Sequence, residues 1–191
     1  MLLFSKSKRV YSYIIIIELI ITVTLIYFLF FGIESKHHFG KRIIVVNDGL
    51  IYQKGESQPF TGRILDTLQK SIIIEYDVVN GIKNGEFFLS NLDGIYTVYG
   101  FINDNKNVGT WHYYYDDGQL ECTGDFKDDK PTGKWVWYHK NGVKKSEGFY
   151  INGRPEGKWI QYDKDGYTNL IIKYQNGELL SSVEITKPAL I

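Results

Sequence analysis

The chain has 191 residues with 22 basic and 22 acidic side chains, so its formal net charge is zero. This balance excludes the strongly basic surface that holds nucleic-acid phosphates, and we expect no nucleic-acid partner. Tyrosine (15), phenylalanine (11) and glycine (19) are abundant while proline (4) is scarce, which favours strands separated by glycine turns. Cys122 is the single cysteine of the sequence, which excludes an intrachain disulfide and a cysteine-rich metal site.

The N-terminal region has the composition of a membrane anchor. Residues 1–9 form a short basic segment, and residues 10–33 are predominantly apolar with one charged side chain. As a helix this run would be about 36 Å long, enough to cross a hydrocarbon core of about 30 Å. It is longer than the apolar core of a signal peptide, and no small-residue cleavage site follows it. We therefore predict a single-pass transmembrane helix at 10–33 in the cell membrane, with residues 1–9 in the cytoplasm.

Glu18 is the one charged residue inside this apolar run. A carboxylate at the centre of a membrane helix costs about 2.5–3.5 kcal/mol on insertion scales. A protonated side chain, or one that faces a neighbouring helix, is the simpler interpretation. Association of chains through Glu18 is the alternative, and crosslinking of a Glu18→Leu variant tests it.

A lead-in region connects the anchor to the rest of the chain. Residues 34–42 read as a polar linker, and residues 43–61 read as a β-hairpin. Asp48-Gly49 predicts the turn of that hairpin, because tight turns need positive φ angles. Residues 62–84 read as a degenerate first repeat, and residues 181–191 as a C-terminal tail.

A period of 24 residues organises the stretch from 85 to 180 into four units, 85–108, 109–132, 133–156 and 157–180. Two series of glycines carry this period: Gly85, Gly109, Gly133 and Gly157, and then Gly94, Gly118, Gly142 and Gly166. Each unit contains two β-prone runs and two turn signals, which predicts one hairpin per unit. The predicted fold class is therefore mainly β, an antiparallel array of hairpins in a single sheet.

Aromatic residues repeat with the same step and form two columns. One column is Phe87, Trp111, Trp135 and Trp159, and the other is Tyr114, Tyr138 and Tyr162. Because the columns are three residues apart, they face opposite sides of a regular strand. The sequence leaves open which column shares its face with the repeated strand glycines, since a shift of one residue inverts every side chain. Five aromatic residues are candidates for an interaction surface: Trp111, Tyr113, Trp135, Trp137 and Trp159.

The repeated pattern G-x-W-x-x-Y-x-x-x-G, followed by G-x-Y-x-x-G, resembles MORN-type repeats. It is most similar to the bacterial MORN-variant arrays of the YwqK family, which is labelled the antitoxin component of a toxin–antitoxin module. The resemblance covers roughly residues 50–180 and includes the lead-in Pro59-Phe60-Thr61-Gly62. Phe87, Ser90 and Ile172 depart from the pattern, all in terminal units. The resemblance implies a single curved β-sheet and a protein-binding role with a toxin as partner.

Residue types that could carry catalysis do not recur at fixed places in the repeat. His112 aligns with Val136 and Ile160, so the array does not preserve a histidine site. His139 aligns with Tyr115 and Asp163, and Ser90, Ser146 and Cys122 are candidates for a nucleophile by residue type only. Asp163 and Asp165 begin like a calcium loop, but the twelfth position is not acidic, and the segment matches the turns of other units. We expect no catalytic residue, metal, cofactor or small-molecule substrate.

The sequence therefore predicts a membrane-anchored repeat protein that acts as a protein-interaction module. A scaffold that associates with lipids or the cell envelope is the alternative from a different class, and an enzyme is the third. Removing an exposed aromatic side chain should abolish binding of a protein partner without unfolding the domain. A lipid-binding scaffold should bind vesicles through the repeats.

Overall fold

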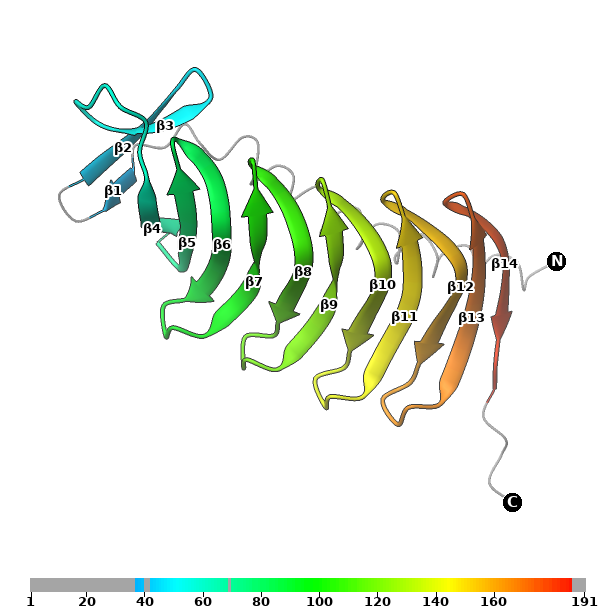
Figure 1. The fold of residues 1–191 in the computed structure, drawn as a ribbon. Helices are drawn as coiled ribbons and strands as arrows, with labels where there is room; N and C mark the ends of the chain where they lie inside the picture. Colours follow the sequence, from blue (N-terminus) through cyan, green and yellow to red (C-terminus); the bar gives the residue numbers. More distant parts are fainter. Residues whose placement is uncertain (1–36, 40–41, 69, 187–191) are drawn as a thin grey trace. The chain divides into compact units, whose positions relative to one another are not determined.

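The computed structural model describes residues 37–39, 42–68 and 70–186. The chain divides into two units, Met1–His37 and His38–Ile191, and the following account concerns the second. The predicted transmembrane segment at 10–33, with Glu18, lies outside the described residues. Within the described ranges, no helix is long and apolar enough to cross a membrane. The regular elements there are β-strands (Figure 1).

The lead-in forms a small sheet with the order β1-β2-β3, from β1 (His37–Phe39), β2 (Arg42–Asn47) and β3 (Leu50–Gln53). Asp48 and Gly49 join β2 to β3 with φ angles of 49° and 77°, which confirms the predicted hairpin turn. One prediction needs correction here, because the segment 34–42 contains β1 and the start of β2 rather than only a linker. The lead-in strands pair in a sheet of their own, and backbone hydrogen bonds such as the one from Ile51 N–H to Gly81 O also join them to the main array.

The larger sheet has eleven antiparallel strands that follow one another in sequence order. In Figure 1 the successive hairpins stand side by side, and their strands bow in the same direction. This arrangement confirms the mainly β, antiparallel hairpin array. The strands are β4 (Gly62–Leu68), β5 (Ile72–Val79), β6 (Ile82–Asn91), β7 (Tyr96–Asn103), β8 (Lys106–Tyr114), β9 (Leu120–Lys127), β10 (Lys130–Tyr138), β11 (Lys144–Ile151), β12 (Arg154–Tyr162), β13 (Thr168–Gln175) and β14 (Glu178–Glu184).

Turns of two kinds alternate along the array. Five two-residue turns have positive φ angles at both positions, as the tightest hairpins require: Asn80-Gly81, Asp104-Asn105, Asp128-Asp129, Asn152-Gly153 and Asn176-Gly177. The longer loops contain the second glycine series, and each of these glycines has a positive φ between 78° and 88°. There Gly142 N–H donates to His139 O at 2.8 Å, which closes the loop.

From the sequence, 128–133 and 152–157 read as turns that end at Gly133 and Gly157, but the structure places the first glycine series inside strands. β8 begins at Lys106 and β12 at Arg154, each three residues before its glycine. The two-residue turns suffice to reverse the chain, and Gly109 and Gly157 instead occupy bulges where the strand register shifts. The array also extends beyond its predicted end, because β14 runs to Glu184 and replaces the start of the expected tail at 181.

The bulges decide which aromatic column shares the glycine face. A Cβ atom added to Gly124 would lie 2.1 Å from the Trp135 ring, and one added to Gly148 would lie 2.1 Å from the Trp159 ring. Gly100 has the same relation to Trp111. Each indole therefore lies against the backbone of the preceding strand, where only glycine leaves room. The tryptophan column, not the tyrosine column, faces the repeated strand glycines.

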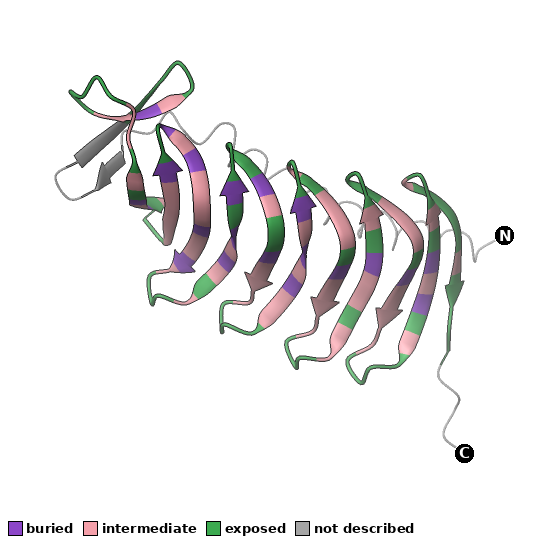
Figure 2. Ribbon diagram, in the orientation of Figure 1, coloured by how far each residue is buried: buried purple, intermediate pink, exposed green. Residues whose placement is uncertain are grey.

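We call this side of the sheet the Trp–Gly face, and it contains the core of the array. Its buried residues, including Phe87, Trp111 and Trp135, form one cluster, and Figure 2 shows a band of buried positions that crosses successive strands. The rings contact one another from strand to strand: Trp111 and Phe126 centroids lie 5.7 Å apart, and Phe126 and Trp135 centroids 5.2 Å apart. Each repeat thus buries its aromatic residue against its neighbours, as in other repeat arrays.

Candidate functional site

The five aromatic residues predicted as an interaction surface all lie on the Trp–Gly face. Trp111 is 1% exposed, and Trp135 and Trp159 are each 6% exposed. The prediction that these three indoles present an exposed surface is therefore wrong, because the small glycines beside them let the rings enter the core. Tyr113 and Trp137 are half-buried and pack against the same cluster. The candidate site described below lies on the opposite face of the sheet.

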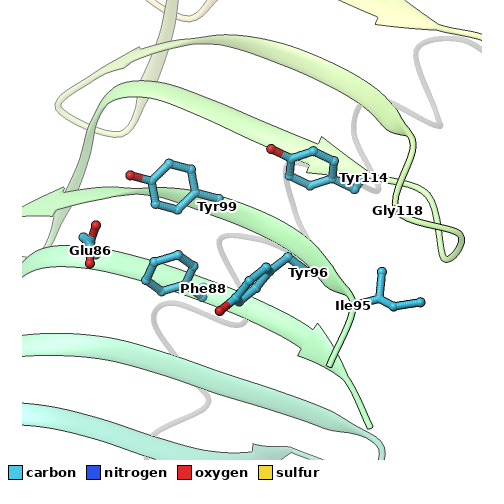
Figure 3. A pocket seen from close by; sticks show the side chains of 7 residues that line it. All are labelled: Glu86, Phe88, Ile95, Tyr96, Tyr99, Tyr114 and Gly118. Carbon is cyan, nitrogen blue, oxygen red and sulfur yellow. The ribbon is translucent and has the colours of Figure 1, made fainter. Parts of the chain in front are cut away.

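A shallow recess lies on that opposite face, across the first full repeat and the strand that follows it. Its volume is about 450 Å³. Figure 3 shows Glu86 and Phe88 on β6, Tyr96 and Tyr99 on β7, and Tyr114 on β8. The lining residues are Glu86, Phe88, Ile95, Tyr96, Tyr99, Tyr114 and Gly118. We call this group the aromatic recess.

The rings of the aromatic recess are held by stacking on one another. Phe88 stacks on Tyr99 with centroids 4.9 Å apart, and Tyr96 lies 5.2 Å from Phe88 on the other side. His112 stacks on Tyr99 at 6.1 Å with an interplanar angle of 9°. Tyr96 is nonetheless 51% exposed. Fixed and exposed ring faces with phenol hydroxyls suit binding by stacking and hydrogen bonding.

Glu86 lies at one side of the recess and belongs to an ion-pair network. Its Oε2 accepts a hydrogen bond from Arg63 Nη2 at 2.7 Å. Arg63 also pairs with Asp77 at 2.7 Å and with Glu75 at 3.0 Å. The hydrogen bond from Arg63 holds the pKa of the Asp77 carboxyl below its usual value. Arg63 lies 5.7 Å from the Phe88 ring centre, so this network fixes both the charge and the ring at the rim.

The same place two repeats later, 48 residues along the chain, is built differently. The corresponding residues are Glu86 and Lys134, Phe88 and Val136, Tyr96 and Lys144, Tyr99 and Glu147, and Tyr114 and Tyr162. Rings at three of these five positions are replaced by an aliphatic or charged side chain. The aromatic recess is therefore a local departure from the repeat.

At these equivalent positions 48 residues later, charged side chains pair with one another and fill the surface where the recess would be. Glu147 Oε2 lies 2.7 Å from Lys134 Nζ and 3.0 Å from Lys144 Nζ, and Tyr162 O–H donates to Glu147 Oε1 at 2.6 Å. Hydrogen bonds from Lys134 and Tyr162 lower the pKa of Glu147 to about 2. Burial, together with the bond to Glu147, raises the pKa of Tyr162 to about 12. We call these four residues the Glu147 cluster, and its polar groups are satisfied by one another.

The residues weighed for catalysis have structural partners. His112 Nδ1 lies 3.2 Å from Thr123 Oγ1, and His139 Nε2 lies 3.0 Å from the Tyr162 carbonyl oxygen in the next repeat. Cys122 and Ser90 are buried. No group of three or more potential metal ligands occurs among the residues that the structure describes.

The repeated positions of the sequence do not indicate the aromatic recess, because the recess lies where the repeat is not kept. The signal that could have indicated it is a position at which the repeats differ. Tyr99 stands where the later repeats have Thr123, Glu147 and Ile171, although the Trp–Gly face keeps its period. An aromatic residue at a partly exposed position that other repeats fill with unrelated side chains marks a place where folding does not dictate the choice.

Comparison with known proteins identifies the repeats. A family model described as the MORN repeat variant matches residues 107–128 and 131–152. No curated protein matches the chain. Two solved structures of TarM show limited likeness: a mutant of S. aureus TarM in complex with Fondaparinux, alpha-GlcNAc-glycerol and UDP (18% identity, TM-score 0.32), and a second TarM structure (15% identity, TM-score 0.24).

These alignments cover 52% and 63% of this chain but only 19% of each TarM chain, so it spans about a fifth of their length. TM-scores this low carry no argument about fold or function. The matched residues lie in β8 to β11 and include Trp111 and Trp135, the indoles of the Trp–Gly face. The chain therefore carries MORN-variant repeats.

Proposed function

We propose that the chain is a protein-interaction module that receives its partner in the aromatic recess. The single observation that supports this most strongly is the contrast between the exposed Tyr96 and half-buried Tyr99 rings and the closed Glu147 cluster at the same place in a later repeat. Protein interfaces are enriched in tyrosine and other aromatic residues, which offer large contact areas at low entropic cost.

Site-specific photo-crosslinking in cells of the source organism tests this function. A photoreactive phenylalanine analogue at Tyr96 should capture one defined protein, whereas the same analogue at Tyr167 should not. Tyr167 is a matched control because it is 60% exposed and lies in a loop of the last repeat. Adding Tyr99→Ala to the Tyr96 probe should abolish capture, and Tyr99→Phe should preserve it. Equal capture at both probe positions would contradict a partner site in the recess.

The family resemblance suggests the identity of the partner. YwqK-type arrays are labelled antitoxin components, and we propose an antitoxin or immunity-like role in which the partner is a toxin protein. A toxin encoded next to this gene should arrest growth when expressed alone and should be neutralised by this chain. Neutralisation that persists unchanged with Tyr96→Ala and Tyr99→Ala would separate that role from the aromatic recess.

We further propose that residues 10–33 anchor the module in the cell membrane. The support is the length and apolar composition of that run. Alkaline extraction of membranes distinguishes the alternatives. A spanning helix keeps the full chain in the membrane pellet, whereas a scaffold that associates only with lipid headgroups is released into the supernatant. Release would favour the lipid-associated scaffold over the anchored module.

A further inference from the structure

The two ends of the eleven-stranded sheet differ in how they are covered. At the β4 end, the lead-in packs against the array through the buried side chains of Ile51, Ile64 and Val78. Backbone hydrogen bonds join the same region, from Ile51 N–H to Gly81 O at 2.9 Å and from Gly81 N–H to Phe60 O at 2.7 Å. The ion pairs of Arg63 add fixed charge to this outermost strand. That end has the polar, covered form expected of a cap.

β14 forms the other end of the sheet. Within the part of the chain that the structure describes, it has neither a covering segment nor an ion-pair network like that of Arg63. Four apolar side chains on or just after it are exposed: Leu179 (43%), Leu180 (52%), Val183 (59%) and Ile185 (41%). Charge is confined to the two ends of the strand, at Glu178 and Glu184. Among the described residues, β14 pairs only with β13. A long uncharged edge of this kind is a template for pairing with another strand, unless lysine, proline or a cover protects it.

The hydrogen-bonding pattern shows which backbone groups of β14 are directed away from the sheet. Ile185 N–H donates to Asn169 O at 2.9 Å, toward β13. The β13–β14 register is regular from Glu184 to Ser181, so the direction alternates with each residue. The N–H and C=O groups of Ser182 and Glu184 therefore point outward from the edge.

We propose that β14 pairs antiparallel with β14 of a second copy of this chain, about a two-fold axis through Ser182, joining two sheets edge to edge. A two-fold axis perpendicular to the sheet keeps each face on its own side, so both faces continue across the junction. Ser182 then exchanges two backbone hydrogen bonds with its symmetry mate, and Ser181 lies opposite Val183. This is the self-complementary contact that a symmetric dimer requires.

The charges on β14 support this register. With the axis at Ser182, and with the extra residue of the β14 bulge taken into account, Glu184 lies opposite the Leu179–Leu180 bulge and Glu178 lies opposite Ile185. No carboxylate therefore faces another, whereas like charges directly opposite would destabilise a strand pair. The bulge in β14, where Tyr174 pairs with Leu179 and Lys173 with Ser181, lies near one end of the ladder and leaves its centre regular.

Disulfide trapping of the full chain, purified in detergent, tests the proposal. The background is Cys122→Ser, which removes the one native thiol. Ser182→Cys should then form a covalent dimer on mild oxidation, because directly opposed residues at such a pair lie about 5.5 Å apart between Cα atoms, within the range for a disulfide. Gln119→Cys, exposed in a distant loop, is the control and should stay monomeric. Equal crosslinking of the two variants would overturn the proposal.

Light scattering of the unmodified chain gives a second, independent readout. We expect a mass of twice 22.2 kDa after correction for detergent. Val183→Lys should weaken the dimer by at least about tenfold in dissociation constant while leaving the fold intact, because the side chain is exposed and lysine protects edges. A monomer in the unmodified chain at every concentration would overturn the proposal, as would occupation of the edge by another segment or protein.

Glu18→Leu separates this interface from association through the predicted membrane segment. The dimer should persist in Glu18→Leu and weaken in Val183→Lys. The reverse result would assign association to residues 10–33 and remove β14 from it. The proposal does not depend on the aromatic recess, which lies on other strands, so Tyr99→Ala should leave the dimer unchanged.

Discussion

The two faces of the large sheet stand in different relations to the 24-residue period. On the Trp–Gly face the period is kept, with Trp111, Trp135 and Trp159 each seated against a glycine of the preceding strand. On the opposite face the column of Tyr114, Tyr138 and Tyr162 keeps the period, but other aligned positions hold unrelated side chains, as from Phe88 to His112, Val136 and Ile160. Packing therefore dictates the residues of the Trp–Gly face, whereas several positions of the opposite face are free to vary.

The largest expected effect comes from removing an indole of the Trp–Gly face. Trp135→Ala should lower the free energy of unfolding by about 3–5 kcal/mol, because it leaves a cavity among the rings of Tyr113, Phe126, Trp137 and Tyr150. Urea denaturation followed by circular dichroism measures this. A loss below about 1 kcal/mol, as is usual for a surface residue, would contradict the assignment of this face to the core.

Adding one methyl group beneath an indole should have the next largest effect. Gly124→Ala should cost about 1–3 kcal/mol, because the new Cβ would lie 2.1 Å from the Trp135 ring. The double variant Gly124→Ala with Trp135→Leu should be less destabilised than the sum of the single variants, since the smaller side chain relieves the clash. Strict additivity would show that the two positions do not touch.

On the opposite face, the Glu147 cluster should make a smaller, pH-dependent contribution. The pKa of Glu147 is lowered to about 2 from an ordinary value of 4.5, so the stabilisation is present above pH 4.5 and is lost as pH falls toward 2. Because Lys134 is 50% exposed, solvent screening limits the effect to about 1 kcal/mol. Glu147→Gln should have a lower free energy of unfolding than the unmodified chain at pH 7, and the two should have the same free energy of unfolding near pH 2. A difference that is constant over this range would contradict the ion pairing.

The smallest effect on stability is expected in the aromatic recess. Tyr96→Ala should change the free energy of unfolding by less than about 0.5 kcal/mol, because the ring is 51% exposed. The same change should nevertheless abolish co-purification of the partner, and Tyr96→Phe should retain it. Loss of folding with Tyr96→Ala would show that this ring stabilises the sheet. It would contradict the assignment of structural packing to the Trp–Gly face alone.

Local signals predicted the hairpins well. Asp48-Gly49 and Asn152-Gly153 specify tight turns by their own backbone preferences, and no distant contact is needed to recognise them. The face that carries the tryptophans could not be predicted, because it depends on bulges at Gly109, Gly133 and Gly157 that shift the register within strands.

The candidate site was beyond prediction for a related reason. Tyr99 and Tyr114 come from different 24-residue units, and only the pairing of β7 with β8 brings them to one surface. The 24-residue period draws attention to the residues that recur, and the recurring tryptophans belong to the hydrophobic core. Tyr113 and Trp137 looked like surface candidates because aromatic residues favour interfaces, but two-residue spacing places them on the same face as Trp111 and Trp135.

Fluorescence quenching offers the most direct test of the division between the faces. The four tryptophans of the chain, at 111, 135, 137 and 159, all lie on the Trp–Gly face, so their emission reports that face alone. We predict that the native chain emits at shorter wavelength than the denatured chain and that iodide quenches it several-fold more weakly. Emission and quenching equal to those of the denatured chain would place the indoles in water and contradict the account.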